Sequence, residues 1–205
     1  MWPFAHLAVG YLLYSAYSHA RFRRPPDQTA AVLVVFGTQL ADFIDKPLAL
    51  LGVLESGRSL GHSYLVVLPV ILLVGGAVYR MRGEFGPTVA FGMGYASAPL
   101  GDGAPQFLQG TFETDLREVS FWVWPFEFPA ERIADALAQA PGIGHTITHK
   151  AAWTAANIPS YPELGLWVRS FEVGVTLLAA GVWVYDGRPG WALARDVVRS
   201  VREKR

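Results

Sequence analysis

The stretch 64–79 reads Tyr64-Leu-Val-Val-Leu-Pro-Val-Ile-Leu-Leu-Val-Gly-Gly-Ala-Val-Tyr79, and it contains no charged residue. A helix that contacts water needs a polar face, and this stretch offers none. Its length approaches the roughly 17–25 residues that cross a bilayer. We therefore interpret it as a transmembrane helix. The alternative, a buried helix in a soluble helical bundle, is disfavoured because no side of the stretch is polar.

Four further apolar stretches accompany it, at about 4–17, 29–44, 87–100 and 166–185. The chain has 205 residues, of which 52% are hydrophobic and 17% are charged, whereas soluble domains carry about 25% charged residues. The sequence predicts an all-α fold, a multi-pass integral membrane helical bundle of about five spans in a single membrane domain. The N-terminus lacks the basic region and cleavage site of a signal peptide, so we expect the first apolar stretch to be retained.

The distribution of charge predicts the orientation in the membrane. Basic residues cluster after the first stretch, after the third stretch and in the tail 186–205, whereas 101–165 holds three basic and eight acidic residues. Positive loops face the cytoplasm, so we expect the N-terminus outside and the C-terminus in the cytoplasm of a cell-membrane protein. Seventeen basic residues balance seventeen acidic ones, which removes the electrostatic case for a nucleic-acid partner.

Two segments lie outside the predicted spans. Residues 103–165 form an extracytoplasmic insertion that we expect to be mostly helical, with an amphipathic helix at 129–140. Its aromatic cluster 121–128 suits the outer membrane interface, and a wall that contacts the acyl chain of a membrane lipid is the sharper alternative. The tail 186–205 has the pattern of a basic amphipathic helix on the cytoplasmic leaflet, although a solvated helical tail fits equally well.

Ionisable residues gather at the predicted outer ends of the spans. Because charged groups near a membrane are costly, they usually pair with one another or serve a function. The chain has no cysteine, so a divalent metal such as zinc would be held by imidazole and carboxylate groups. The bland alternative is that charged residues collect at span ends in any membrane protein. The residues at this side are His6, Asp42, Asp45, His62, Asp102, His145 and His149.

The end of the second stretch and the loop that follows it contribute further ionisable residues to this side. Asp42 and Asp45 are three residues apart and share one side of a helix end. Arg58 precedes His62 in Ser56-Gly-Arg-Ser-Leu-Gly-His-Ser63, and a guanidinium can clamp a phosphate with two parallel hydrogen bonds. An ordinary ion pair of Arg58 with Asp42 or Asp45 is the competing interpretation.

At these residues the sequence resembles the YdjM-like family of small membrane-bound metal-dependent hydrolases, over about the first half of the chain. The resemblance implies that His6, Asp42, His62 and Asp102 are metal ligands, and the order of these residues is also similar to the ligand series of zinc-dependent phospholipase C. One position departs from the family pattern, because Ala98 stands where a histidine is expected. The loss of this imidazole either empties the site or leaves it with fewer ligands, unless His145 or His149 supplies the missing nitrogen. The matching stretches are 1–12, Gly37-Thr-Gln-Leu-Ala-Asp-Phe-Ile-Asp-Lys-Pro47, 56–63 and Gly94-Tyr-Ala-Ser-Ala-Pro-Leu-Gly-Asp102.

The resulting hypothesis is a metal-dependent hydrolase that acts on a phosphoester or related ester at the outer membrane interface, with a membrane lipid as the natural partner. A water molecule activated by the metal is the expected nucleophile. Asp45 would act as general base or orient a ligand, and Arg58 would bind the substrate anion. The main alternative is a non-catalytic membrane protein of the same fold that has lost its metal site and serves binding or assembly with a membrane-protein partner. A cation or proton transporter that uses Asp42, Asp45 and His62, and a lipid phosphatase with a histidine nucleophile, are weaker alternatives.

Overall fold

The computed structural model describes residues 3–103, 119–127 and 161–203, and every regular element in these ranges is a helix. The all-α prediction is therefore confirmed for the described part of the chain. Each of the five predicted apolar stretches lies within one long helix. These helices are α1 (Pro3–Phe22), α2 (Gln28–Leu50), α3 (Tyr64–Arg82), α4 (Phe85–Gly103) and α8 (Tyr161–Tyr185). Two further elements are a short 3-10 helix, η2 (Ser120–Val123), and the tail helix α9 (Trp191–Glu203).

Short capping signals set the helix ends. The carboxylate of Asp27 accepts a hydrogen bond from the backbone N–H of Ala30 at 2.8 Å and caps the start of α2. The hydroxyl of Ser63 accepts from Leu65 in the same way at the start of α3. Gly83 follows the last residue of α3 and caps the helix, and its φ of 70° lies in the left-handed region that favours glycine. These caps satisfy backbone donors and acceptors that a helix end leaves open.

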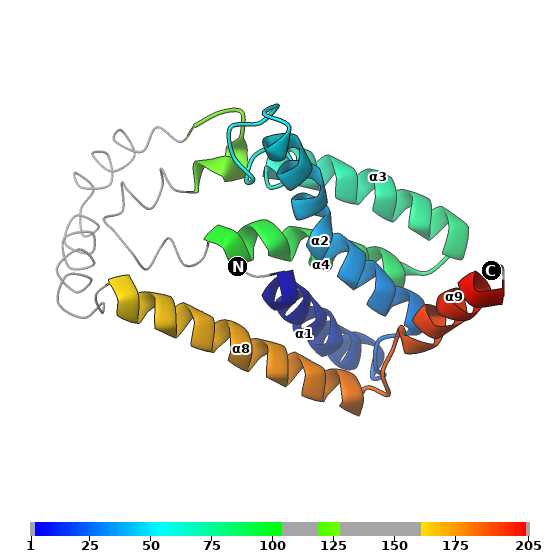
Figure 1. The fold of residues 1–205 in the computed structure, drawn as a ribbon. Helices are drawn as coiled ribbons and strands as arrows, with labels where there is room; N and C mark the ends of the chain where they lie inside the picture. Colours follow the sequence, from blue (N-terminus) through cyan, green and yellow to red (C-terminus); the bar gives the residue numbers. More distant parts are fainter. Residues whose placement is uncertain (1–2, 104–118, 128–160, 204–205) are drawn as a thin grey trace, which may run out of the picture.

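Helix α4 lies at the centre and contacts α1, α2 and α3, whereas α8 packs against α1. Figure 1 shows α3 on one side of this group and α8 on the opposite side. Two glycines allow α2 and α4 to approach closely, because a Cβ atom at Gly37 would lie 2.6 Å from the carbonyl oxygen of Phe91, and one at Gly94 would lie 2.6 Å from that of Val34. Small residues serve this purpose in membrane helix pairs.

The outward surface of α3 is apolar, with Leu65, Leu68, Leu72 and Leu73 exposed. In the described ranges two helical segments are long and apolar enough to cross a membrane on their own, namely α3 and residues 168–185 of α8. Helices α1, α2 and α4 bury polar side chains against one another, which lowers their hydropathy. Hydropathy therefore does not identify these three helices as spans, and the five-span bundle predicted from the sequence is not confirmed by the described residues.

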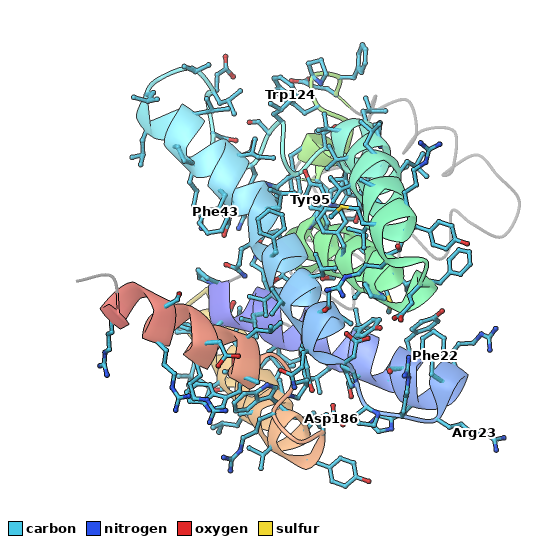
Figure 2. The ribbon with its side chains drawn as sticks, turned by 90° about the vertical axis from the view of Figure 1, so that its right-hand side faces the viewer. Phe22, Arg23, Phe43, Tyr95, Trp124 and Asp186 are labelled. Carbon is cyan, nitrogen blue, oxygen red and sulfur yellow. The ribbon has the colours of Figure 1, made fainter. Side chains whose placement is uncertain are left out.

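Different residues lie at the two ends of the helix group. Trp124, which follows η2, lies near one end and Asp186 near the other, with Tyr95 between them (Figure 2). The tail predicted as an amphipathic helix forms α9, which contacts α2. The predicted helix at 129–140 and the histidines His145 and His149 lie outside the described residues.

Candidate functional site

The structure brings together the ionisable residues that the sequence placed at one side. His6 comes from the first turns of α1, Asp42 and Asp45 from the second half of α2, and Asp102 from the end of α4. His62 lies in the loop between α2 and α3. Four different segments therefore converge, and the side chains of His6, Asp45, His62 and Asp102 are all buried.

Asp45 fixes the position of His62. Its Oδ2 atom lies 2.7 Å from Nδ1 of His62, and it also accepts hydrogen bonds from the backbone N–H groups of Ser59 at 2.8 Å and His62 at 3.2 Å. Its Oδ1 atom accepts from the backbone N–H of Gly61 at 2.7 Å. With Asp45 accepting at Nδ1, the proton of a neutral imidazole sits there and Nε2 is left as the lone-pair nitrogen.

Asp102 lies between the two histidines. Its Oδ1 atom is 3.3 Å from Nε2 of His6, and its Oδ2 atom is 3.3 Å from Nε2 of His62. Burial lowers the pKa of His62, but the neighbouring carboxylates of Asp102 and Asp45 raise it more, so the pKa of His62 lies above its usual value. Two imidazole rings thus share one buried carboxylate.

The free ring nitrogens provide a test of whether a cation fits. Both nitrogens of His6 and Nε2 of His62 are buried and form no hydrogen bond. The two Nε2 atoms face Asp102 oxygens at 3.3 Å, and a buried polar atom without a hydrogen bond is costly. Ligand atoms about 2.0–2.1 Å from a tetrahedral zinc ion stand roughly 3.3 Å apart, which is close to the separations found around Asp102. The set of two imidazole nitrogens and carboxylate oxygens therefore suits a zinc-like cation.

Two basic residues already hold the carboxylates of this cluster. Nζ of Lys46 lies 2.6 Å from Oδ2 of Asp42, whose Oδ1 is 3.8 Å from Nε2 of His62. Arg58 places Nε 2.9 Å from Oδ2 of Asp102. In the described ranges no group of three or more His, Asp or Glu side chains is arranged as a ready-made metal site. A cation would have to loosen these two ion pairs on binding.

The sequence interpretation of Arg58 needs one correction. The competing interpretation paired Arg58 with Asp42 or Asp45, but the structure pairs it with Asp102. The cause is tertiary, because the end of α4 packs beside the loop that carries Arg58, and Lys46 occupies Asp42 from one turn along α2. The Arg58 side chain remains partly exposed, at 42%.

The aromatic segment covers the cluster on one side. The Phe121 ring meets the His62 ring edge-to-face at 6.0 Å between centroids, and Nε1 of Trp122 donates to the carbonyl of Pro99 at 2.9 Å. Ser63 donates to the carbonyl of Trp124 at 2.8 Å. The sequence assigned this segment to the membrane interface and gave no sign of its contact with His62. Aromatic side chains close to the spans were the only available signal.

A polar cavity of about 700 Å³ opens beside the aromatic segment. Its lining includes Lys46, Glu55, Arg58, Phe121 and Trp124. Arg58 therefore connects the cavity to the carboxylate of Asp102. A polar molecule in this cavity would lie next to the His/Asp cluster.

Ala98 is the position where the resemblance leads one to expect a histidine. It is buried in an apolar cluster with Ala41, Val67, Phe91 and Tyr95. The hydroxyl of Tyr95 is buried without a partner. An alanine therefore contributes packing here, and the imidazole of the family pattern is absent from α4.

A second polar cluster, which sequence reasoning missed, lies at the opposite end of the molecule. Oδ2 of Asp186 accepts hydrogen bonds from Tyr11 and Ser15, both at 2.7 Å, and Oδ1 lies 2.8 Å from Nε2 of His19. These contacts attach the end of α8 to α1. No local sequence signal links residues so far apart in the chain.

The sequence matches the YdjM inner membrane protein family over residues 1–180. The chain belongs to the YdjM inner membrane protein family. No curated protein and no solved structure matches it.

Membership of the YdjM family confirms the resemblance seen in the sequence and extends it from the first half of the chain to residue 180. It also identifies the chain as a membrane protein, in agreement with its two strongly apolar helical segments. The similarity to zinc-dependent phospholipase C is not shown by any of these comparisons. The YdjM family description names a location and no reaction, so the chemistry of the cluster has to be argued from its residues.

Proposed function

We propose that this YdjM family member is a multi-pass membrane protein whose His/Asp cluster binds a divalent cation and hydrolyses a phosphoester or related ester at the outer membrane interface. The observation that carries the proposal is the pair of buried Nε2 atoms of His6 and His62. Each faces an oxygen of Asp102 at 3.3 Å without forming a hydrogen bond. Zinc is the cation that this donor set suits best.

His6, His62 and Asp102 would hold the cation, and Asp42 would complete the set. When bound, such a cation lowers the pKa of a water molecule to about 7 and polarises a phosphoryl or acyl oxygen. Asp45 holds the ring of His62 in the tautomer that presents Nε2. Asp45 is fully buried and accepts three backbone hydrogen bonds, so in this proposal it orients His62.

Arg58 and the aromatic segment serve the substrate. Arg58 lines the polar cavity and is partly exposed, so it could exchange its contact with Asp102 for a phosphate in the cavity. Phe121 packs on His62 and keeps water away from one side of the cluster. Lower access of water strengthens each electrostatic contact inside.

A non-catalytic protein of the same fold is the second candidate. Ala98 favours it, because the α4 helix supplies one ligand fewer than the family pattern implies. The ion pairs of Lys46 and Arg58 also favour it, since they satisfy Asp42 and Asp102 without a cation. In that case the polar cavity would serve binding or assembly.

The decisive experiment measures the metal content of the full-length protein in detergent by elemental mass spectrometry, after incubation with Zn²⁺ or Mn²⁺ and removal of free ions. We expect one ion per chain in the wild type and none in His62→Ala. His19→Ala is the matched control, because His19 lies at the opposite end on Asp186, and it should keep the ion.

A chromogenic phosphodiester then tests the reaction, and its hydrolysis should follow the metal content across the three proteins. A wild-type protein that binds neither ion would overturn the hydrolase proposal and favour the non-catalytic candidate. Metal retained by His62→Ala would show that the ion lies elsewhere.

A further inference from the structure

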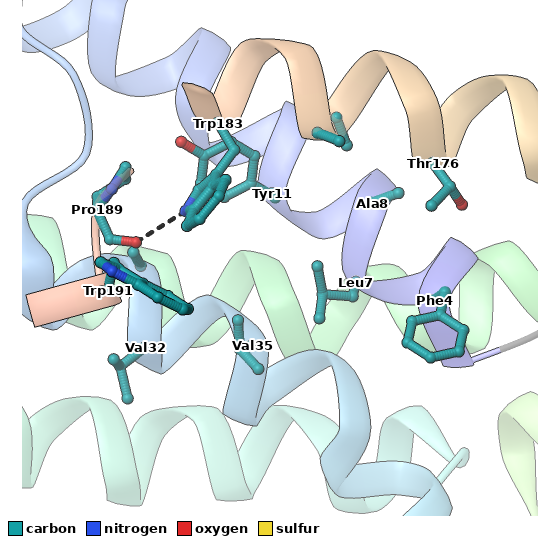
Figure 3. Close-up of a pocket in the computed structure, with 14 residues that line it drawn as sticks. Phe4, Leu7, Ala8, Tyr11, Val32, Val35, Thr176, Trp183, Pro189 and Trp191 are labelled. Carbon is teal, nitrogen blue, oxygen red and sulfur yellow. Dashed lines mark hydrogen bonds between the residues drawn. The ribbon is translucent and has the colours of Figure 1, made fainter. Parts of the chain in front are cut away.

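An apolar groove runs along α1 at some distance from the His/Asp cluster. It encloses about 450 Å³ between α1, α2, α8 and the start of α9. Figure 3 shows Phe4 at one end and Trp183 and Trp191 at the other, with Val32 and Val35 along one wall. Nε1 of Trp183 donates to the carbonyl of Pro189 at 3.0 Å, so the polar atom of this ring is satisfied and its apolar surface faces the groove.

A second cavity of about 350 Å³ continues from the first along α8. The two share Phe4 and Thr176, and the second reaches Arg169 and Glu172. From Arg169 to Trp183 the helix rises about 21 Å at ~1.5 Å per residue. One leaflet contributes roughly 15 Å of the ~30 Å hydrocarbon core, so the combined groove is long enough for one extended acyl chain.

We propose that this groove binds one acyl chain of a membrane phospholipid, with the headgroup at the Arg169 end and the chain end against Trp183 and Trp191. Three observations carry the inference. The main groove is lined almost entirely by carbon, its rim includes the exposed Val32 and Val35, and charged residues line only the Arg169 end. The chain belongs to a membrane protein family, so lipid is the abundant apolar molecule at this surface.

The headgroup end of the groove lies at the same end of the molecule as the candidate site, on another face of α1. Phe4 lies two residues before His6 in the first turns of α1, so the headgroup end of the groove is at the same end of the molecule as the cluster. If the proposed function holds, this identifies a lipid ester as the substrate class. The groove itself requires no metal, so the two proposals fail independently.

Native mass spectrometry of the full-length protein in detergent, with palmitoyl-oleoyl phosphatidylglycerol added as the probe, tests the inference. The variant Ala180→Phe fills the groove from α8, where Ala180 is exposed and lines the cavity. Ala77→Phe is the matched control, because Ala77 is exposed on α3 outside the groove. We expect one saturable lipid per chain in the wild type and the control, and at least a tenfold weaker association in Ala180→Phe.

A second measurement locates the lipid. Phosphatidylglycerol with a dibrominated chain quenches tryptophan fluorescence at short range, and Trp183 and Trp191 would report a chain in the groove. Quenching should saturate with the bound lipid in the wild type and in Ala77→Phe and should fall in Ala180→Phe.

Equal lipid binding by all three proteins would overturn the inference, as would a wild type that retains no lipid. A wild-type dimer that Ala180→Phe converts to a monomer would also overturn it, because a second copy of the chain would then fill the groove. Metal content is measured separately and does not affect any of these outcomes.

Discussion

Asp45 shows how a residue can serve the candidate site without facing it. Its carboxylate accepts three backbone hydrogen bonds in addition to the contact with His62. A buried carboxylate with this many partners is held firmly in place. The loop around His62 is therefore ordered by Asp45, and His62 is ordered with it.

Asp45→Asn tests this role. An amide nitrogen cannot accept the hydrogen bonds that the carboxylate oxygens accept, so His62 loses its fixed tautomer, and we expect zinc affinity to fall by about 10–100-fold. Competition of the full-length protein with a fluorescent zinc chelator measures the affinity. Glu55→Gln, at an exposed position of the same loop whose side chain makes no contact with Asp45 or His62 among the hydrogen bonds of these residues, should leave it unchanged.

Thermal unfolding of both variants establishes whether they are folded at the temperature of the assay. An Asp45→Asn protein that is folded and binds zinc as tightly as the wild type would contradict the orienting role.

The residues of the cluster could be found from the sequence because they mark the ends of predicted spans, and alternating spans bring such ends together. The function of each residue within the cluster could not be found in this way. The pairing of Arg58 with Asp102 and the contact of Phe121 with His62 depend on how the end of α4 and η2 pack against the loop. These contacts join residues 44 and 59 positions apart, and no periodicity encodes them.

At the scale of helices, the close approach of α2 and α4 sets the geometry of the bundle. Gly37 and Gly94 face each other across this contact, and each would place a Cβ against the backbone of the opposite helix. Backbone cannot move aside as the end of a flexible side chain can. The distance between Asp42 on α2 and Asp102 on α4 therefore depends on these two glycines.

Gly94→Ala should destabilise the protein by about 1–3 kcal/mol, because the added methyl group overpacks the contact. Gly76→Ala is the matched control, since nothing lies within 4 Å of a Cβ atom at this position on α3. The control should be neutral or more stable, because alanine favours a helix over glycine by up to ~1 kcal/mol.

Unfolding of the detergent-solubilised proteins, followed by circular dichroism, measures both changes. Equal stability of the two variants would mean that α2 and α4 separate easily, contrary to the packing described here.

The helices themselves could be predicted well, and the reason is physical. Apolar stretches bounded by Asp27, Ser63 and Gly83 carry both a period and an end signal, and each such stretch became one long helix. Whether each helix crosses the membrane is a different question. Helices α1, α2 and α4 combine apolar residues with buried polar ones, so within the described ranges hydropathy alone identifies only α3 and residues 168–185 of α8 as spans.

For the whole molecule, we propose that all five long helices cross the membrane, which puts the N-terminus outside and the C-terminus in the cytoplasm. The basic loops after α1 and after α3 favour this orientation. An alkaline phosphatase fused after Arg205 should be inactive, and a green fluorescent protein at the same point should fluoresce. Alkaline phosphatase inserted after Gly52, in the loop that carries Arg58 and His62, should be active.

The opposite pattern of activity at both positions would invert the orientation. Active phosphatase at both positions would exclude an odd number of crossings between them and so exclude the five-span arrangement.

The cluster around Asp186 has a consequence for how the protein is made. Tyr11 and Ser15 leave the ribosome well before their acceptor Asp186, from which they are separated by 175 and 171 positions. Chains are synthesised from the N-terminus, so these two hydroxyl groups cannot reach this acceptor until the end of α8 has been made. A nascent chain that stops before Asp186 would keep polar groups exposed on α1, and quality-control proteases of the membrane would have a feature by which to tell an unfinished copy from a finished one.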